Sequence, residues 1–343
     1  MIFINTSFEL KRKVGIGAYI LTLIEALKEQ KQEYKCVELT IPAWIKYKWF
    51  FQMIWLNTVI FLLTLIKKPK LFISPSFIMP YFKVKGTKYV TVIHDLCSAR
   101  VGEMKKYHQY IYETSINIAI KKADIIVTVS ETIKNELIEK YNINPNRIIV
   151  VYNSIGKHLI HVEVKQDILN KYGLQKDKYI LSVATLNKRK NIPELIKAFE
   201  SISDKYPELK LVLVGGLGNE NREKLSKHPK IIFTGYISDE EIPTLYKNAL
   251  LYVYPSLYEG FGIPLIEAQY CSCPVLCSDI PVFREIGLNS AEYCKPSAKD
   301  IADKIEYLID NTQKCAELVR EGNENVKRFS IKKISEQLDN IVY

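Results

Sequence analysis

Short apolar segments alternate with longer amphipathic segments along most of the chain. The apolar segments are rich in isoleucine and valine and offer no polar face, which is typical of strands buried in a parallel sheet. In the first half they predict strands over residues 1–5, 70–74, 88–93, 124–130 and 148–153. The segments between these strands predict helices over residues 16–31, 104–122 and 131–141.

The alternation stops at residues 154–165, which have no periodic apolar face, and then resumes. The second array predicts strands over residues 179–185, 210–215, 230–235, 251–256 and 274–279. It predicts helices over residues 191–204, 239–248, 264–270 and 298–311, and residues 329–343 are also helical by pattern. Two such arrays joined by a linker predict an α/β protein with two doubly wound, Rossmann-like parallel-sheet domains. Because such sheets bind ligands at the carboxyl ends of their strands, we expect two domains, 1–160 and 161–328, that face a central cleft.

Residues 49–66 form an uncharged segment of 18 residues with lysines on both sides. This length is marginal for a membrane-spanning helix. The segment contains Gln52 and Asn57 and leads directly into a predicted strand, so a spanning helix would interrupt the first sheet. We therefore expect a helix that is buried or lies at an interface. The aromatic residues beside the lysines suit contact with anionic headgroups, and core packing is equally compatible with the pattern: Trp44, Tyr47, Trp49, Phe50, Phe51 and Trp55.

The net charge of +10 is confined to the first third of the 343 residues. Residues 1–122 contain 19 lysines and arginines against 8 acidic residues, whereas residues 123–343 contain 29 against 30. We therefore expect a polyanion or an anionic surface to meet the first part of the chain. The apolar share of 48% and the charged share of 25% are those of a globular protein, which excludes a disordered or collagen-like chain.

Cysteine usage and the first residues bear on the location of the protein. The 7 cysteines are scattered and form no C-x-x-C pair, so we interpret them as free thiols of a reducing compartment. The chain starts without a basic segment before an apolar stretch, so no secretory signal is visible. Both observations predict a cytoplasmic location.

Residues 254–267 contain the most informative candidate chemistry, with the sequence Y-P-S-L-Y-E-G-F-G-I-P-L-I-E. Gly260 and Gly262 lie in a predicted strand-to-helix turn, where free backbone N–H groups and the positive helix end suit a diphosphate. Glu259 and Glu267 flank this turn and can accept hydrogen bonds from hydroxyl groups on either side of a phosphate. In the alternative interpretation, Glu267 only stabilises the helix dipole and Glu259 is a solvated loop residue.

Two cations, Arg189 and Lys190, follow the strand predicted over residues 179–185. Cations at the carboxyl end of a strand can neutralise a diphosphate leaving group, as a metal ion does in other enzymes. The chain contains no D-x-D sequence, so we expect a site without a metal. We also expect no cofactor. In the alternative interpretation, these cations lie in a solvated loop and bind nothing.

The first half of the chain offers two weaker signals. Gly15 and Gly17 lie between a strand and a helix, where glycine lets the backbone approach a phosphate or sugar closely. The full G-x-G-x-x-G sequence is absent because residue 20 is isoleucine, and a plain tight turn is the alternative. His94 ends the strand predicted over 88–93 and is either a catalytic or a structural histidine.

Together these motifs resemble those of the retaining nucleotide-sugar glycosyltransferases of family 4, the glycosyl transferases group 1, which have the GT-B fold. E-G-F-G-I-P-L-I-E-A at residues 259–268 is similar to the E-x7-E signature of that family. Further similar motifs occur in the family's order: V-G-I-G-A-Y at 14–19, T-V-I-H-D-L at 91–96, V-S-E at 129–131, the strand ends at 150–154, 213–218 and 234–241, and T-L-N-K-R-K-N at 185–191. The resemblance covers nearly the whole chain.

The resemblance implies a role for each candidate residue. Glu259 would hold hydroxyls of the donor sugar, Glu267 would bind the ribose, and His94 would contact the transferred sugar. Arg189 and Lys190 would hold the diphosphate. Backbone groups would complete the donor site, with Phe261, Gly262, Ile263 and Leu265 at the diphosphate, Tyr236 and Ile237 at the base, and Gly15 and Gly17 at the donor phosphate or the acceptor.

The resemblance also implies that the two domains bind different substrates. The first domain would bind the acceptor and be completed by residues 329–343, and the second would bind the nucleotide sugar. Two departures from the family pattern are Ser272, where glycine is frequent, and Ala184–Thr185, where Arg or Lys is frequent. The second departure leaves the phosphate charge to Arg189 and Lys190.

For the reaction we expect front-face substitution with retention, because Glu259 is the only carboxylate placed near the sugar, and its implied role is hydroxyl binding. The motifs look most like those of mannosyltransferases that use GDP-mannose, while a UDP-hexose or a dTDP-sugar donor stays open. The basic, aromatic first domain favours a glycan or lipid-linked acceptor in polysaccharide or lipopolysaccharide synthesis. We therefore expect peripheral contact with anionic lipid at the inner face of the cell membrane.

Two other classes of protein compete with this interpretation. An NAD-dependent oxidoreductase or epimerase would share the Rossmann halves, but it needs the full glycine fingerprint and a Tyr-x-x-x-Lys pair. A nucleic-acid-binding protein would match the net charge, but the basic residues follow no known reading motif, so we expect no nucleic-acid partner.

Overall fold

The computed structural model describes residues 1–7, 15–39, 51, 54–96, 106–156, 159, 166–185, 187–216 and 225–343. The chain forms two compact units. Unit 1 comprises Met1–Ser154 together with Phe329–Tyr343, and unit 2 comprises Ile155–Arg328. The units therefore divide at 154/155 and 328/329, whereas the sequence pattern places the first boundary at 160/161.

Unit 1 contains a sheet of six parallel strands in the order β2-β1-β3-β4-β5-β6. The strands are β1 (Ile2–Asn5), β2 (Tyr34–Val37), β3 (Leu71–Ser74), β4 (Lys88–Ile93), β5 (Ile125–Thr128) and β6 (Ile148–Val150). The helices are α1 (Ile16–Glu29), the π-helical turn η1 (Leu56–Ile60), α3 (Phe61–Lys67), α4 (Lys106–Lys122), α5 (Glu131–Tyr141), the 3-10 turn η3 (Pro145–Arg147) and α14 (Ile331–Val342).

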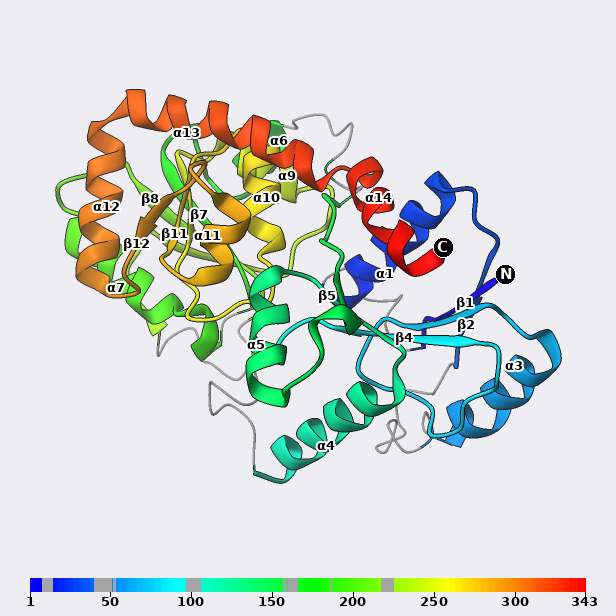
Figure 1. Cartoon of the computed structure of the whole chain (residues 1–343). Helices are drawn as coiled ribbons and strands as arrows, with labels where there is room; N and C mark the ends of the chain where they lie inside the picture. The colour runs from blue at the N-terminus through cyan, green and yellow to red at the C-terminus, as the bar shows by residue number, and fades with distance from the viewer. Residues whose placement is uncertain are drawn as a thin grey trace. The chain divides into compact units, whose positions relative to one another are not determined.

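Helices cover both faces of this sheet (Figure 1). Crossovers between parallel strands are right-handed, so the outward step from β1 to β2 places α1 on one face. The later steps run in the opposite direction and place α3, α4 and α5 on the other face. The C-terminal helix α14 packs beside α1, where the Gln30 amide donates to Ser335 O at 2.7 Å and to Asp339 Oδ1 at 2.6 Å.

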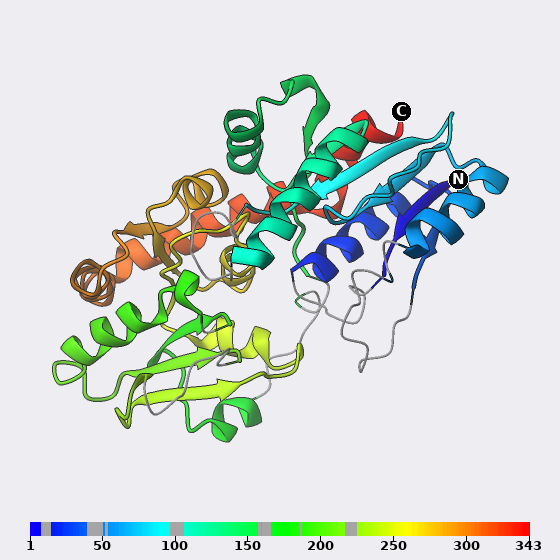
Figure 2. The same ribbon diagram turned by 90° about the horizontal axis from the view of Figure 1, so that it is seen from below.

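Unit 2 contains a second sheet of six parallel strands in the order β12-β11-β10-β7-β8-β9, with helices on both faces (Figure 2). The strands are β7 (Tyr179–Val183), β8 (Lys210–Val214), β9 (Ile231–Gly235), β10 (Leu251–Tyr254), β11 (Val275–Ser278) and β12 (Glu292–Cys294). The α-helices are α6 (Gln166–Lys171), α7 (Ile192–Ile202), α9 (Ile242–Asn248), α10 (Ile263–Tyr270), α11 (Pro281–Gly287), α12 (Ala298–Asp310) and α13 (Thr312–Asn325). Two segments, η5 (Lys188–Lys190) and η6 (Val326–Phe329), are 3-10 turns. The chain re-enters unit 1 at Phe329, the last residue of η6.

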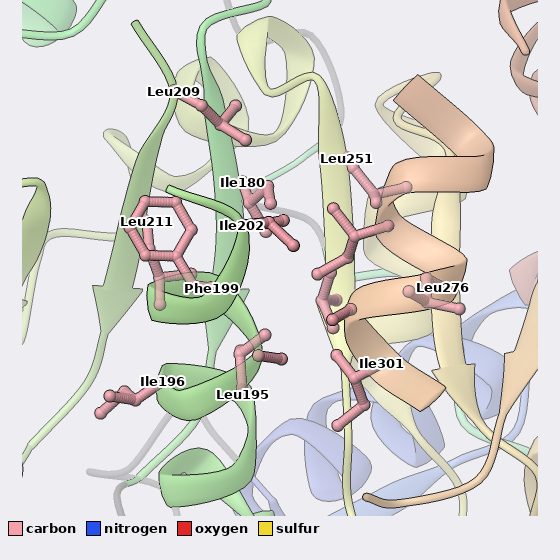
Figure 3. Packing of buried hydrophobic residues seen from close by; sticks show 14 of the residues in the cluster. Ile180, Leu195, Ile196, Phe199, Ile202, Leu209, Leu211, Leu251, Leu276 and Ile301 are labelled. Carbon is pink, nitrogen blue, oxygen red and sulfur yellow. The ribbon is translucent and has the colours of Figure 1, made fainter. Parts of the chain in front are cut away.

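The hydrophobic core on one side of the second sheet lies against α7 and α12 (Figure 3). Phe199 of α7 and Ile301 of α12 are fully buried there beside Leu251 and Val253 of β10. Because side chains alternate along a strand, Tyr252 and Tyr254 of β10 point to the opposite face of the sheet. This alternation separates an aliphatic core from a tyrosine-rich layer.

Every strand predicted from the sequence is present, and both sheets are parallel, which confirms the prediction of two Rossmann-like, doubly wound sheets. The strands β2 and β12 were not predicted from their patterns, because each lies at a sheet edge and carries partly exposed residues among apolar ones. The helices α6, α11 and α13 were also not predicted. Helix α13 buries only Leu318, Gly322 and Asn325, so its apolar periodicity is weak.

The uncharged segment 49–66 is helical from Ile54 onward and continues through η1 and α3. In the described parts of the chain no helix has the length and apolar character needed to cross a membrane. Leu56, Ile60 and Thr64 are buried on one side of the segment, whereas the other side is exposed. Trp44, Tyr47, Trp49, Phe50, the start of the predicted helix at 104 and most of 154–165 lie outside the described residues.

Candidate functional site

The predicted donor-site residues of unit 2 follow the carboxyl ends of three strands. The turn η5 follows β7, Tyr236 and Ile237 follow β9, and residues 255–262 follow β10. Gly215 and Gly216, for which the sequence predicts no site role, follow β8. Because the strands are parallel, these segments all leave the sheet at one edge, the edge at which doubly wound sheets bind ligands.

Local hydrogen bonds fix the turn that carries the two cations. The side chain of Asn187 caps this turn, and its Oδ1 accepts a hydrogen bond from Lys190 N at 3.1 Å. The chain leaves the turn through Asn191, whose left-handed φ of 56° suits asparagine. The carbonyl of Arg189 accepts a hydrogen bond from Leu257 N at 2.8 Å, which ties the cation turn to the loop after β10.

Glu259 lies between the two cations. Its Oε2 accepts a hydrogen bond from Arg189 Nη1 at 2.7 Å, and its Oε1 accepts one from Lys190 Nζ at 2.5 Å. The Glu259 side chain is 8% exposed, and those of Arg189 and Lys190 are 18% and 12% exposed. Two cations thus converge on one carboxylate in a largely buried cluster, which leaves the site with a net positive charge that suits an anion.

The electrostatics of the cluster keep Glu259 ionised. Burial on its own would raise the pKa of Glu259, but Lys190 and Arg189 outweigh burial and hold the pKa below its usual value. The carboxylate is therefore charged at neutral pH and accepts hydrogen bonds only. An acceptor of this kind suits the hydroxyl groups of a sugar.

Tyr254 supports Lys190 from the layer of tyrosines beneath the loop. Its hydroxyl accepts a hydrogen bond from Lys190 Nζ at 3.2 Å, and Lys190 Nζ lies 5.2 Å from the centre of its ring. Burial raises the pKa of Tyr254 well above the usual value, so the hydroxyl stays protonated. The tyrosine therefore positions a charged partner without adding charge of its own.

A row of buried aromatic rings joins the two predicted glutamates. Ring centres are 5.8 Å apart between Tyr254 and Tyr252 and 5.3 Å apart between Tyr252 and Tyr246. The Tyr246 hydroxyl lies 3.5 Å from Oε2 of Glu267, whose side chain is buried on α10. Glu267 thus reaches the same tyrosine-rich layer as Glu259.

The glycine before α10 is required by its surroundings. Gly262 has φ of 107°, and a Cβ built on it would lie 2.9 Å from Phe283 Cε1. Phe283 in turn packs against Tyr254, with ring centres 4.7 Å apart. The helix begins at Ile263, and Leu265 N already donates to Gly262 O at 2.9 Å. Close packing thus brings the backbone of this turn down onto the aromatic layer.

The predicted base-site residues lie after β9. The ring of Tyr236 rests on the backbone of Gly216, where a Cβ would come within 2.5 Å of Tyr236 Cε2. The same ring is 79% exposed, so it presents a flat surface to solvent. Tyr236 and Ile237 follow Gly235, whose φ is 70°.

The predicted residues of unit 1 gather at the carboxyl edge of its own sheet. Gly15 is the N-cap of α1 with φ of 60°, and Gly17 is buried in the first turn. His94 follows β4, and its ring meets the ring of Tyr19 edge-on at 5.0 Å. The Tyr19 hydroxyl donates to Val151 O at 3.2 Å.

The protonation of His94 follows from its neighbours. Nε2 lies 2.8 Å from Pro75 O, and because a carbonyl can only accept, Nε2 carries the hydrogen. Burial lowers the pKa of His94, so the ring is neutral at pH 7 and presents Nδ1 as an acceptor. The histidine is therefore equipped to accept a hydrogen bond through Nδ1.

Direct contacts in the structure join Arg189, Lys190 and Glu259, and the aromatic row links them to Glu267. Sequence reasoning missed Tyr254 and Phe283, which support this cluster, and Tyr19, which supports His94. The alternation L-Y-V-Y in β10 is a signal for Tyr254, since it places two tyrosines on one face of a buried strand. The sequence pattern carries no comparable signal for Phe283.

The replacement Tyr254→Phe should weaken the binding of a diphosphate to this cluster about tenfold, the cost of one hydrogen bond to a charged group. The ring and its packing on Phe283 remain, so the melting temperature should change little. Calorimetric titration with inorganic pyrophosphate measures the effect. The matched control is Tyr252→Phe in the same strand; an equal loss of affinity in both variants would contradict a positioning role of Tyr254.

The replacement Gly262→Ala should lower the free energy of unfolding by about 2–3 kcal/mol, because it adds backbone strain to a collision with Phe283. Denaturant titration measures the loss. Gly86→Ala is a matched control, because Gly86 also has a positive φ, of 92°, and a Cβ there meets no atom within 4 Å. A loss no larger than that of the control would show that the contact with Phe283 does not require glycine.

Comparisons with known proteins identify the family of the chain. Residues 14–156 match the family described as Glycosyltransferase Family 4, and residues 164–325 match Glycosyl transferases group 1, so the two together account for most of the chain. The O-antigen chain mannosyltransferase B of Escherichia coli is 29% identical over 278 residues, which cover 77% of this chain and 71% of that protein. The O-antigen chain mannosyltransferase RfbU of Salmonella typhimurium is 31% identical over 231 residues, which cover 66% of this chain and 61% of RfbU.

Similarity in structure extends over the whole chain. Anabaena HepE, solved in complex with UDP and glucose, superposes with a TM-score of 0.75 over 99% of this chain and 98% of HepE. The two sequences are 18% identical, so this likeness concerns the fold.

Proposed function

Because the chain belongs to the glycosyl transferases group 1, glycosyltransferase family 4, and is a glycosyltransferase with the GT-B fold, we propose that it transfers mannose from GDP-mannose with retention of configuration. The observation that carries the proposal is the buried cluster of Arg189, Lys190 and Glu259 at the carboxyl edge of the second sheet. It offers cations to a diphosphate and a charged acceptor to sugar hydroxyls. The relatives from Escherichia coli and Salmonella typhimurium are named as mannosyltransferases, which favours mannose.

The cluster suggests how the donor enters. In the structure Glu259 already occupies Arg189 and Lys190, the cations that the diphosphate would need. A diphosphate that binds these cations competes with the carboxylate and frees its oxygens for the hydroxyls of the donor sugar. The backbone at Phe261, Gly262 and Ile263 completes the anion site through the positive end of α10. Glu267 would take the ribose, and Tyr236 and Ile237 the base.

The proposed reaction is a front-face substitution without a metal ion. The bond between the anomeric carbon and the diphosphate oxygen breaks, and the acceptor oxygen bonds to the same face of that carbon. The proton of the acceptor hydroxyl moves to the departing diphosphate oxygen. Arg189 and Lys190 stabilise the negative charge that develops on the leaving group. His94, neutral and with Nδ1 as acceptor, would contact the transferred sugar.

The proposed acceptor is a glycan or a lipid-linked glycan in polysaccharide or lipopolysaccharide synthesis. The names of the O-antigen mannosyltransferases among the relatives favour it, as does the excess of basic residues in the first third of the chain. Such an acceptor places the enzyme at the cytoplasmic face of the cell membrane as a peripheral protein.

Thermal stabilisation by a panel of donors tests the proposal. GDP-mannose should raise the melting temperature more than UDP-glucose, UDP-N-acetylglucosamine or NAD, in buffer with or without EDTA. Preferential stabilisation by UDP-glucose would replace mannose with a UDP-hexose in the same fold, and stabilisation by NAD alone would favour an oxidoreductase. The anomeric configuration of the product, determined by NMR, tests retention.

A further inference from the structure

The helical segment before β3 exposes apolar side chains where a surface helix ordinarily has polar ones. Leu62 and Ile66 are 54% and 71% exposed. Ile54, Val59 and Leu65 are each between 45% and 47% exposed. These residues lie on the side opposite to the buried Leu56, Ile60 and Thr64, so they are not needed to hold the segment on the sheet.

A neighbouring loop extends this surface. Tyr81 and Phe82 are 43% and 61% exposed. Asn57 Oδ1 accepts hydrogen bonds from Tyr81 N at 2.7 Å and from Phe82 N at 3.3 Å, and the rings of Phe61 and Phe82 pack edge to face with centres 6.0 Å apart. The loop and the helix therefore form one preformed surface. We call it the apolar face; it consists of Ile54, Val59, Leu62, Leu65, Ile66, Tyr81 and Phe82.

The segment of the chain that carries the apolar face has charges of a single sign. Residues 54–94 contain six lysines and no aspartate or glutamate. Lys67 and Lys68 end α3, and Lys83 and Lys85 follow Phe82, so these four adjoin the apolar face in sequence and are exposed. Lys83 pairs with Asp124 at 2.6 Å.

We propose that the apolar face is a docking surface for an anionic lipid bilayer. The apolar side chains would enter the boundary between headgroups and acyl chains, with the helix lying in the plane of the membrane, and the lysines would contact lipid phosphates. A second copy of the chain fits less well, because a symmetric contact through this face would oppose lysines to lysines. The inference gives the membrane contact of the proposed function a specific surface, and it does not depend on the donor or the reaction.

Vesicle sedimentation with the full chain tests the docking surface. Vesicles of phosphatidylglycerol and phosphatidylcholine should bind the protein, those of phosphatidylcholine alone should bind it much more weakly, and added salt should release it. The double replacement Leu62→Glu and Leu65→Glu should lower the partition coefficient at least about tenfold, because it puts charge into the apolar boundary. Lys67→Glu with Lys85→Glu should weaken binding to the anionic vesicles and flatten the salt dependence.

The matched control is Leu21→Glu in the same unit. Leu21 is 42% exposed on α1, which covers the opposite face of the sheet (Figure 1), so the replacement should leave sedimentation unchanged. Equal loss in the control, or no binding of the unmodified protein to anionic vesicles, would overturn the proposal. So would a concentration-dependent dimer that disappears in the Leu62 and Leu65 variant, since it would assign the face to a second copy.

The rise in melting temperature with GDP-mannose separates this inference from the proposed function. The vesicle-binding variants should keep the melting temperature of the unmodified chain and its stabilisation by GDP-mannose, because their replaced side chains are exposed in unit 1 and the donor cluster lies in unit 2. If the protein binds vesicles but GDP-mannose does not stabilise it, the docking surface stands and the proposed donor is rejected. If GDP-mannose stabilises the protein but the protein does not bind vesicles, the donor stands and the docking surface is rejected.

Discussion

Replacing Glu259 with glutamine should lower the rate of sugar transfer roughly 100- to 1000-fold, the effect of removing one preorganised polar group from a reacting centre. Binding of the nucleoside diphosphate alone should stay equal or become tighter. The reason is that Glu259 occupies the two cations to which we propose the diphosphate binds, at 2.7 Å from Arg189 and 2.5 Å from Lys190. The variant would remove this competitor together with the proposed acceptor for the sugar hydroxyls.

The same replacement leaves two largely buried cations without their carboxylate. The free protein should therefore lose about 3 kcal/mol of unfolding free energy, and bound GDP should restore a larger share of stability than in the unmodified enzyme. Initial rates with GDP-mannose and melting temperatures with and without GDP measure both effects. Glu317→Gln, which alters an exposed ion pair on α13, serves as the control. Normal turnover of the Glu259 variant would refute the proposed role, and weaker GDP binding would refute the competition.

Replacing Lys190 with methionine should reduce donor affinity about 100-fold, since the proposed charge-assisted contact to phosphate would be lost in a partly desolvated site. Arg189 would then be the one cation of the cluster left to bind the diphosphate. The variant keeps most of the aliphatic volume above the ring of Tyr254, so the packing of the aromatic layer should persist. Donor titration followed by calorimetry measures the affinity.

Lys188 provides the matched control for this prediction. It belongs to the same turn η5 and has the same side chain, but it is exposed, whereas Lys190 is 12% exposed. Lys188→Met should leave donor affinity within about twofold of the unmodified chain, since an exposed charge contributes little. A similar loss in both variants would mean that the turn contributes only general positive charge.

The sequence predicts the members of the cluster but not their contact. Glu259 follows β10 and Arg189 follows β7, and these strands are separated by two others along the chain. They are neighbours in the sheet, where Leu251 pairs with Ile180. The strand order depends on how the helices pack over the two faces of the sheet, and the local pattern of one strand carries no information about it. This is why each candidate residue could be found while the ion pairs could not.

The uncharged segment shows a different limit of sequence patterns. A helix that is apolar on every side gives no periodicity, so burial in the core and contact with headgroups both fit residues 49–66. The structure shows that one side of the helix from Ile54 onward is buried and that the other side is exposed. Leu56 and Ile60 pack inward, whereas Leu62 and Ile66 face outward.

The return of the chain into unit 1 affects the order in which the protein matures on the ribosome. Helix α14 buries Ile334, Leu338 and Ile341, and Gln337 accepts a hydrogen bond from Tyr152 N at 2.9 Å. Residues 155–328 are continuous, so unit 2 needs no segment from outside this range, whereas unit 1 waits for a helix made more than a hundred residues later. Until α14 is made, the side of α1 that binds α14 therefore stays uncovered in nascent unit 1. A chaperone would bind the unfinished unit at this surface.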